Sequence, residues 1–247
     1  MAMIGFDRPL RPEWIHQSLR LWTPNTPLRA FHSDFNKIAY QLDGKEGKRK
    51  ARTVLFRYFF DFKGRPPNQV TIDFSLLASL SRRLDLDEIK PLYITALILR
   101  SDTLQAILKT LVRLYPSGTI EAKQLIEKSI GLYGERDVVK RSTRSFLSTL
   151  VHFGILDSTG LNYSWKNKLC CSPKQLAYII SFFCIETGCI ELQLEQIKND
   201  ARFALLDLTN LEDCARKYNS KLWSYIRRPS TSKISLYPNL KDLIDQL

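Results

Sequence analysis

The sequence has few of the residues that build disulfide frameworks and metal centres. Its 247 residues contain five cysteines, an odd number without any Cys-x-x-Cys spacing, and three histidines that are isolated from one another. Disulfide-rich scaffolds use even sets of paired cysteines, and structural zinc needs four well-placed ligands, so we expect neither a disulfide framework nor a metal site. Cys184, Cys189 and Cys214 fall in apolar helical patterns, where free cysteine behaves as a small core residue.

Long apolar runs and catalytic motifs are missing as well. The most apolar stretches, 91–99 and 176–185, fall well short of the roughly 20 residues of a membrane-spanning helix, and no apolar segment follows the first residues. We therefore expect a cytoplasmic protein without a signal peptide. The chain holds no phosphate-binding loop, dinucleotide fingerprint, nucleophile elbow or zinc-protease motif. Residues 191–198 faintly resemble the acid-x-Lys pattern of nucleases, but their spacing fits an exposed helix better. We predict a protein that is not an enzyme and uses no cofactor.

Positive charge is in excess. There are 37 Lys and Arg residues against 25 Asp and Glu, which gives a formal net charge of +12 and a pI near 9.5. Residues 1–65 carry 13 Lys and Arg against 6 Asp and Glu, and the stretch 216–233 contains no acid. An excess placed in blocks favours a nucleic acid as the partner, and we expect no membrane association. A solubilising surface charge is the simpler alternative.

The spacing of apolar residues predicts a mainly α-helical protein in three parts. Helices are expected over 12–22, 28–42, 48–60, 70–84 and 90–100, the last of them a central core helix. These helices define an N-terminal helical domain, residues 1–100. A winged helix-turn-helix-like segment, residues 101–172, and a C-terminal helical region, residues 173–247, follow it.

The middle part has the clearest local signature. Helices expected over 103–115, 120–130 and 138–153 precede a β-hairpin or wing over 155–168, which is the outline of a winged helix-turn-helix. In that fold the third helix enters the major groove, with its first residues nearest the base edges. The nucleic-acid contacts predicted here are Lys140, Arg141, Ser142, Thr143 and Arg144, with Lys166 and Lys168 on the hairpin. A helical bundle with a solvated basic face is the alternative.

Two further basic groups are candidate phosphate contacts. The first lies at the start of the helix predicted over 48–60 and contains Lys45, Lys48, Arg49, Lys50 and Arg52. The second lies on a helix that we expect to run from a capping box at 209–212 to Pro229, ahead of a strand-like tail, and contains Arg216, Lys217, Lys221, Arg227 and Arg228. Each group is equally compatible with a solvated helix face.

Aromatic residues follow the first basic group. Phe56, Tyr58, Phe59, Phe60 and Phe62 have the side chains to stack on exposed bases, but aromatic residues at helical spacing more often anchor a helix in the core. We therefore expect this set to pack internally.

Parts of the chain resemble the BrxA family, small DNA-binding components of BREX phage-defence systems. The resemblance rests on Lys48-Arg-Lys-Ala-Arg52, on Ser142-Thr-Arg-Ser-Phe-Leu-Ser-Thr-Leu-Val-His-Phe-Gly-Ile-Leu-Asp157, and on Ser172-Pro173 at the opening of the next helix. It implies a non-catalytic accessory protein of bacterial defence that binds double-stranded DNA and works with other defence proteins.

Two other functions fit the sequence. A scaffold subunit of a larger assembly would expose some of its aromatic residues, among them Trp14, Trp22, Phe31, Phe59, Phe60 and Trp223. A transcription regulator would distinguish its operator from random DNA. If duplex DNA is the partner, the double variant Arg49→Ala, Lys50→Ala should weaken binding without unfolding the protein, and so should the double variant Lys140→Ala, Arg144→Ala.

Overall fold

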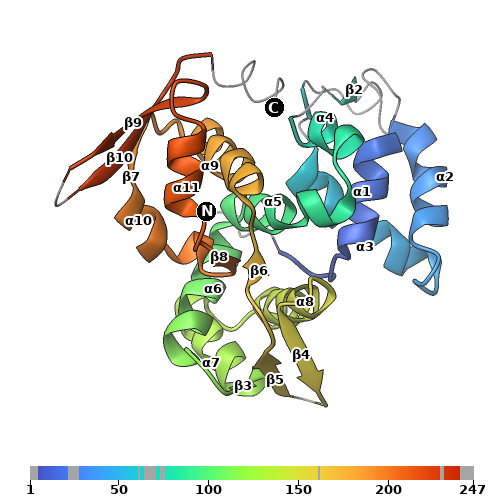
Figure 1. Cartoon of the computed structure of the whole chain (residues 1–247). Helices are drawn as coiled ribbons and strands as arrows, with labels where there is room; N and C mark the ends of the chain where they lie inside the picture. The colour runs from blue at the N-terminus through green and yellow to red at the C-terminus, as the bar shows by residue number, and fades with distance from the viewer. Residues whose placement is uncertain are drawn as a thin grey trace.

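The computed structural model describes residues 5–21, 28–60, 62–63, 71–72, 76–160, 162–228 and 231–239, with only the backbone given for 28–30, 62–63 and 71–72. Helices dominate it, and several small sheets lie at the periphery (Figure 1). The prediction of a mainly α-helical protein is therefore confirmed. Within the described residues, no helix combines the length and apolarity needed to cross a membrane.

The N-terminal part is built around one central helix. Its elements are α1 (Pro12–Leu21), α2 (Leu28–Ile38), α3 (Lys45–Phe59), β1 (Phe62–Lys63), β2 (Thr71–Ile72), α4 (Leu76–Arg83) and α5 (Leu86–Leu99). Helix α5 is buried on nearly every side between Ile89 and Ile98, and it contacts α1, α3, α4, α6 and α9. The predicted core helix is thus confirmed. The helix predicted over 70–84 is shorter than expected, because residues 71–72 pair with 62–63 as a strand.

The middle part contains α6 (Asp102–Leu114), β3 (Thr119–Glu121), α7 (Ala122–Tyr133), α8 (Asp137–His152), β4 (Leu156–Thr159) and β5 (Asn162–Trp165). Ser101 caps α6 by accepting a hydrogen bond from the Leu104 amide. The three strands form an antiparallel sheet in the order β3-β5-β4. The three helices and the hairpin lie where the sequence predicts them, and the sheet gains β3 from residues that the sequence assigned to a turn and a helix start.

The C-terminal part contains β6 (Leu169–Cys170), α9 (Pro173–Thr187), β7 (Glu191–Gln193), α10 (Leu194–Asn199), the 3₁₀ helix η1 (Ala201–Phe203), β8 (Leu206–Asp207), α11 (Leu211–Lys217), β9 (Trp223–Arg227) and β10 (Ser232–Leu236). Strands β7, β10 and β9 form an antiparallel sheet in that order, and β6 pairs with β8 in parallel. A single cluster of buried apolar residues runs through all three parts of the chain.

The prediction of one long C-terminal helix is wrong. Helix α11 ends at Lys217, and the chain turns at Ser220, whose φ is 63°, before it continues as β9. The buried Trp223 indole donates a hydrogen bond to the Ala215 carbonyl at 3.0 Å, which folds the strand back onto the helix. The predicted capping box is absent too, because Thr209 donates to the Asp207 carboxylate instead.

Three of the five cysteines are buried, and this predicts their reactivity. Cys171, Cys184 and Cys214 are at most 4% exposed, whereas Cys170 is exposed. Burial raises the pKa of the Cys171 thiol to about 12, with Asp207 as the next cause, and it also raises the pKa values of Cys184 and Cys214. Because the thiolate is the reactive form, a charged maleimide at neutral pH should modify Cys170 and leave these three intact until the protein unfolds. Mass spectrometry of labelled peptides measures this; rapid labelling of Cys184 or Cys214 in the folded protein would contradict it.

Candidate nucleic-acid interface

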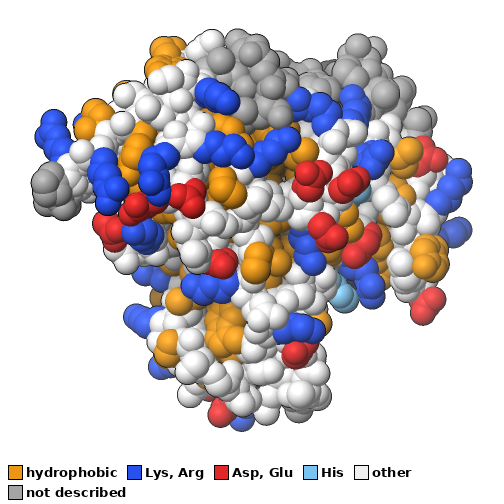
Figure 2. Space-filling model, in the orientation of Figure 1, with side chains coloured by type: hydrophobic (Ala, Val, Ile, Leu, Met, Phe, Trp, Pro, Cys, Tyr) orange, Lys and Arg blue, Asp and Glu red, His pale blue; other side chains and the backbone are white. Residues whose placement is uncertain are grey.

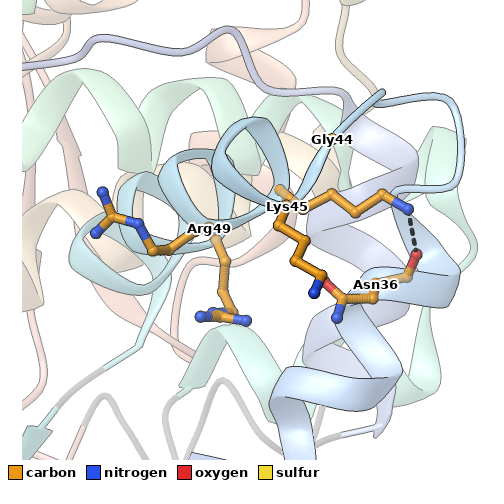
Figure 3. Close-up of a pocket in the computed structure, with 6 residues that line it drawn as sticks. Asn36, Gly44, Lys45 and Arg49 are labelled. Carbon is orange, nitrogen blue, oxygen red and sulfur yellow. Dashed lines mark hydrogen bonds between the residues drawn. The ribbon is translucent and has the colours of Figure 1, made fainter.

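A hollow lined by positive charge lies between α2 and α3. It encloses about 480 Å³ and is lined by Asn36, Gly44, Lys45, Lys48, Arg49 and Arg52 (Figure 3). The Lys48 Nζ donates a hydrogen bond to the Asn36 carbonyl at 3.3 Å, which holds its ammonium group at the rim. We call these six residues the cationic hollow. Four of them are cations and none is an acid, so the hollow has the charge that attracts a phosphate group.

The Glu46 carboxylate forms ion pairs with some of the α3 cations and not with others. The Arg49 guanidinium makes a bidentate pair with Glu46, with contacts of 2.9 and 2.7 Å, and Lys50 approaches the same carboxylate at 3.4 Å. The hydrogen bond from Arg49 lowers the pKa of Glu46 to about 2, so the pair persists across the physiological range. Among the described residues, no ion pair involves Lys48 or Arg52. Burial, and then repulsion from Arg49, lowers the pKa of Arg52, whose side chain therefore gains from a nearby anion.

An extended segment, residues 5–10, joins α3 to α8. The Arg57 guanidinium of α3 donates to the Gly5 carbonyl at 2.7 Å. On the other side of the segment, the Phe6 amide donates to the Ser142 hydroxyl at 2.9 Å. The Leu10 amide donates to the Thr149 hydroxyl at 3.0 Å. The segment thus runs along α8 and is fixed at both ends.

Gly5 lies close against α8. A Cβ atom on Gly5 would lie 2.1 Å from the Val138 Cγ2 atom, which is shorter than any tolerated contact. Phe6 and Leu10 are fully buried and anchor the segment beside it. Residues 5–10, which we call the strap, therefore contact both basic helices.

The exposed edge of α8 is narrower than the sequence predicts. Arg141 and Arg144 are exposed, and no ion pair among the described residues involves either of them. Lys140 is half-buried and pairs with Glu135 at 3.1 Å. The predicted contacts through Ser142 and Thr143 are wrong, because these side chains are 1% and 0% exposed. Ser142 accepts from the strap and Thr143 donates to the Val139 carbonyl, so neither hydroxyl reaches a base.

The hairpin of β4 and β5 adds little positive charge. Lys166 is exposed but pairs with Asp157 at 3.2 Å, and Lys168 is exposed at the end of the hairpin. The charge of Lys166 is therefore partly neutralised by its own sheet. Contacts from this hairpin would be few compared with those from α8.

The C-terminal cations form a separate group. Arg216 pairs with Asp213 at 2.6 Å, and the Lys217 ammonium lies 5.8 Å from the centre of the Tyr218 ring. Lys221, Arg227 and Arg228 are exposed. Figure 2 shows Lys and Arg side chains gathered over this part of the molecule, and Figure 1 places the β9–β10 hairpin on the side of the view away from α2 and α3. The predicted site residues thus fall on two surfaces.

Arg57 continues the basic run that begins at Lys45 in the sequence, and the structure places it against the strap. It follows Arg49 by eight residues, which places it about 80° further round the helix, and its side chain is exposed. We call Arg49 and Arg57 on α3, with Arg141 and Arg144 on α8, the basic strip. The role of Gly5 in linking α3 to α8 depends on contacts with Arg57 and Val138, which are distant in sequence, so no local sequence pattern predicts it.

The aromatic residues proposed for stacking or scaffolding are buried. Phe56, Tyr58, Phe59 and Phe60 are at most 6% exposed, as the packing interpretation predicted. The Phe62 side chain and Trp22 lie outside the described residues. The remaining scaffold candidates, Trp14, Phe31 and Trp223, are at most 3% exposed. These side chains form no apolar surface for a protein partner.

The described residues contain no group of three or more His, Cys, Asp or Glu side chains placed to hold a metal ion. Comparison of the chain with protein-family models, with curated proteins and with solved structures finds no match. The case for a function therefore rests on the geometry of the two basic surfaces.

Proposed function

We propose that this protein is a non-catalytic, duplex-DNA-binding protein that grips the phosphate backbone with the basic strip and the cationic hollow. The observation that carries the proposal is the position of α8. It is the third helix of a unit with the order α6-β3-α7-α8-β4-β5, which is the order of a winged helix-turn-helix. In that fold the third helix enters the major groove. The exposed edge of α8 carries Arg141 and Arg144, which have the donors for guanine edges and phosphates.

The α3 cations support the same proposal. The strap places Arg57 beside Gly5, which itself lies against α8, so a duplex seated on α8 has positive charge on its flank. Phosphate contacts of this kind fix the position of a protein on DNA without reading sequence. The resemblance to BrxA adds the biological setting to the proposal: an accessory role in BREX-type phage defence.

A salt titration tests the proposal directly. Fluorescence anisotropy would compare duplex DNA, single-stranded DNA and duplex RNA of equal length. We expect the duplex DNA to bind most tightly, with log K falling by about 0.9 per neutralised phosphate for each unit of log salt. Binding that is absent at low salt, or that is insensitive to salt, would contradict the proposal. Tighter binding of duplex RNA than of duplex DNA would indicate that RNA is the partner.

The cationic hollow yields a separate prediction. The Lys48→Ala, Arg52→Ala double variant should weaken binding to all duplex sequences alike and should make the salt slope shallower by about two units, because two phosphate contacts are lost. Folding should be unaffected, since the substitutions remove no apolar contact from the core. The binding isotherms at several salt concentrations measure both effects.

Helix α6 offers a matched control for this variant. Lys109 and Arg113 are exposed on α6, which lies on the left of the view in Figure 1 while α2 lies on the right, and their replacement by alanine removes the same charge. The control should keep the wild-type slope. If both double variants lose affinity equally, the effect comes from net charge and the hollow is not a contact site.

A further inference from the structure

The C-terminal part of the chain repeats the architecture of the middle part. The middle unit follows the order α6-β3-α7-α8-β4-β5, and the C-terminal unit follows the order α9-β7-α10-η1-β8-α11-β9-β10. Apart from η1 and β8, both are helix-strand-helix-helix-strand-strand. The two units, Asp102–Trp165 and Pro173–Leu236, have the same length. Figure 1 shows each unit ending in a projecting hairpin.

The sheets of the two units also match. In each, the last strand is central and pairs antiparallel with both others, in the orders β3-β5-β4 and β7-β10-β9. In each, the first strand has one buried residue between two exposed ones, and a helix starts directly after it. The buried residue is Ile120 in one unit and Leu192 in the other. A buried residue of the next helix also follows five residues later in each unit, at Leu125 and Ile197.

The two units differ in where their positive charge lies. Helix α11 has seven residues where α8 has sixteen, and its first turn carries Glu212 and Asp213, which would repel a phosphate. The insertion of η1 and β8 before α11 accompanies this shortening. The last turn of α11 carries Arg216 and Lys217, and further positive charge lies beyond the helix, at Lys221, Arg227 and Arg228.

In the part of the chain that the structure describes, the cations at Lys221, Arg227 and Arg228 are not neutralised by carboxylates of the β9–β10 hairpin. Lys233, on β10, is held by both oxygens of Glu191 at 3.0 Å. By contrast, no ion pair among the described residues involves Lys221, Arg227 or Arg228. Lys221 lies in the turn before β9 and Arg227 ends the strand, which spans about 13 Å from Trp223 to Arg227 at about 3.3 Å per residue. A duplex carries roughly eight backbone charges over that length.

We propose that residues 173–236 form a second winged-helix unit, which binds duplex phosphates through its β9–β10 hairpin, at Lys221, Arg227 and Arg228, while the first unit holds another stretch of the same duplex. This inference rests on the proposed function. In the second unit the β9–β10 hairpin makes the contact with DNA, because the acidic first turn of α11 disfavours insertion of that helix into a DNA groove. Two linked units would raise the affinity for a long duplex without any new contact in either unit.

Duplex length separates one-unit from two-unit binding. Anisotropy would be measured with labelled duplexes of about 12 and about 40 base pairs, because about 10 base pairs make one helical turn. For wild type we expect the long duplex to bind at least about tenfold more tightly than its greater number of overlapping sites explains. The Arg227→Ala, Arg228→Ala variant should lose this excess and bind the short duplex like wild type. The Lys109→Ala, Arg113→Ala variant is the charge-matched control, and thermal melting verifies the fold of each protein.

The other outcomes are distinct. If the hairpin variant keeps the length excess, the second unit does not bind the duplex, and the proposed function survives through the basic strip. If the hairpin variant weakens on both duplexes equally, the hairpin is the primary site and the two-unit arrangement is wrong. If wild type binds neither duplex, the proposed function and this inference fail together.

Discussion

Replacing Arg141 and Arg144 by glutamate is expected to weaken duplex binding by about a hundredfold or more. Each arginine lies on the exposed edge of α8 with no acidic partner among the described residues. The Arg141 Nε donates to the Asp137 carbonyl at 3.3 Å, which leaves the terminal nitrogens of that guanidinium to contact DNA. Loss of one arginine contact to a base edge costs about 1–3 kcal/mol, and 1.4 kcal/mol corresponds to a factor of ten. Two such losses reach a hundredfold, and the introduced carboxylates add repulsion from the phosphates.

A charge-preserving variant separates recognition from attraction. The Arg141→Lys, Arg144→Lys variant keeps the positive charge but loses the bidentate geometry, so it should keep most of the salt slope and lose any preference between sequences. The Lys109→Glu, Arg113→Glu variant controls for charge reversal elsewhere. Near wild-type affinity for the Arg141→Glu, Arg144→Glu protein, with its melting curve intact, would move the interface away from α8.

Apolar periodicity located most of the helices because their burial is one-sided. Helix α6 was expected over 103–115 and spans Asp102–Leu114, and α8 was expected over 138–153 and spans Asp137–His152. Each has one face against the core, which leaves the i, i+3, i+4 spacing in the sequence. The central helix α5 was recognised from its nearly unbroken apolar run.

The C-terminal hairpin could not be found in the same way. Tyr218, Leu222 and Ile226 continue the helical spacing of α11, yet Trp223 and Ile234 are the side chains that face the core from the paired strands. The choice of strand over helix depends on pairing between β9, β10 and β7. The pairing of β10 with β7 joins residues far apart in sequence, such as Lys233 and Gln193, and local spacing does not encode it.

The sequence predicted where positive charge gathers, but it did not predict which of these side chains are exposed and free of ion pairs. Local pairs such as Arg49 with Glu46 are spaced three residues apart on one helix, so the sequence does contain the signal for them. The burial of Ser142 has no such signal, because its partner, the Phe6 amide, is 136 residues away. An amphipathic pattern shows which face of α8 meets its own unit. It does not show that a distant strap covers a second face.

The second large expected effect is the loss of stability when Phe6, in the strap, is replaced by alanine. Phe6 is fully buried, and its ring lies edge-on to Tyr58 of α3 at a centroid distance of 5.8 Å. Truncating a buried phenylalanine to alanine removes its contacts and leaves a cavity, at a cost of about 3–5 kcal/mol. We therefore expect Phe6→Ala to lower the free energy of unfolding by about 3 kcal/mol or more. The Leu21→Ala variant, at an exposed position, should change it little.

Hydrogen exchange distinguishes loss of the strap from general destabilisation. The Phe6 and Leu10 amides are donors to Ser142 and Thr149 of α8, so both should be protected in wild type. In Phe6→Ala these two amides should exchange faster than the amides of α5, and duplex binding should weaken, because the Arg57–Gly5 contact that brings α3 to α8 depends on the same segment. Uniformly faster exchange over the whole chain, with duplex affinity unchanged at a temperature where the variant is folded, would show that the strap stabilises the core but does not organise the basic strip.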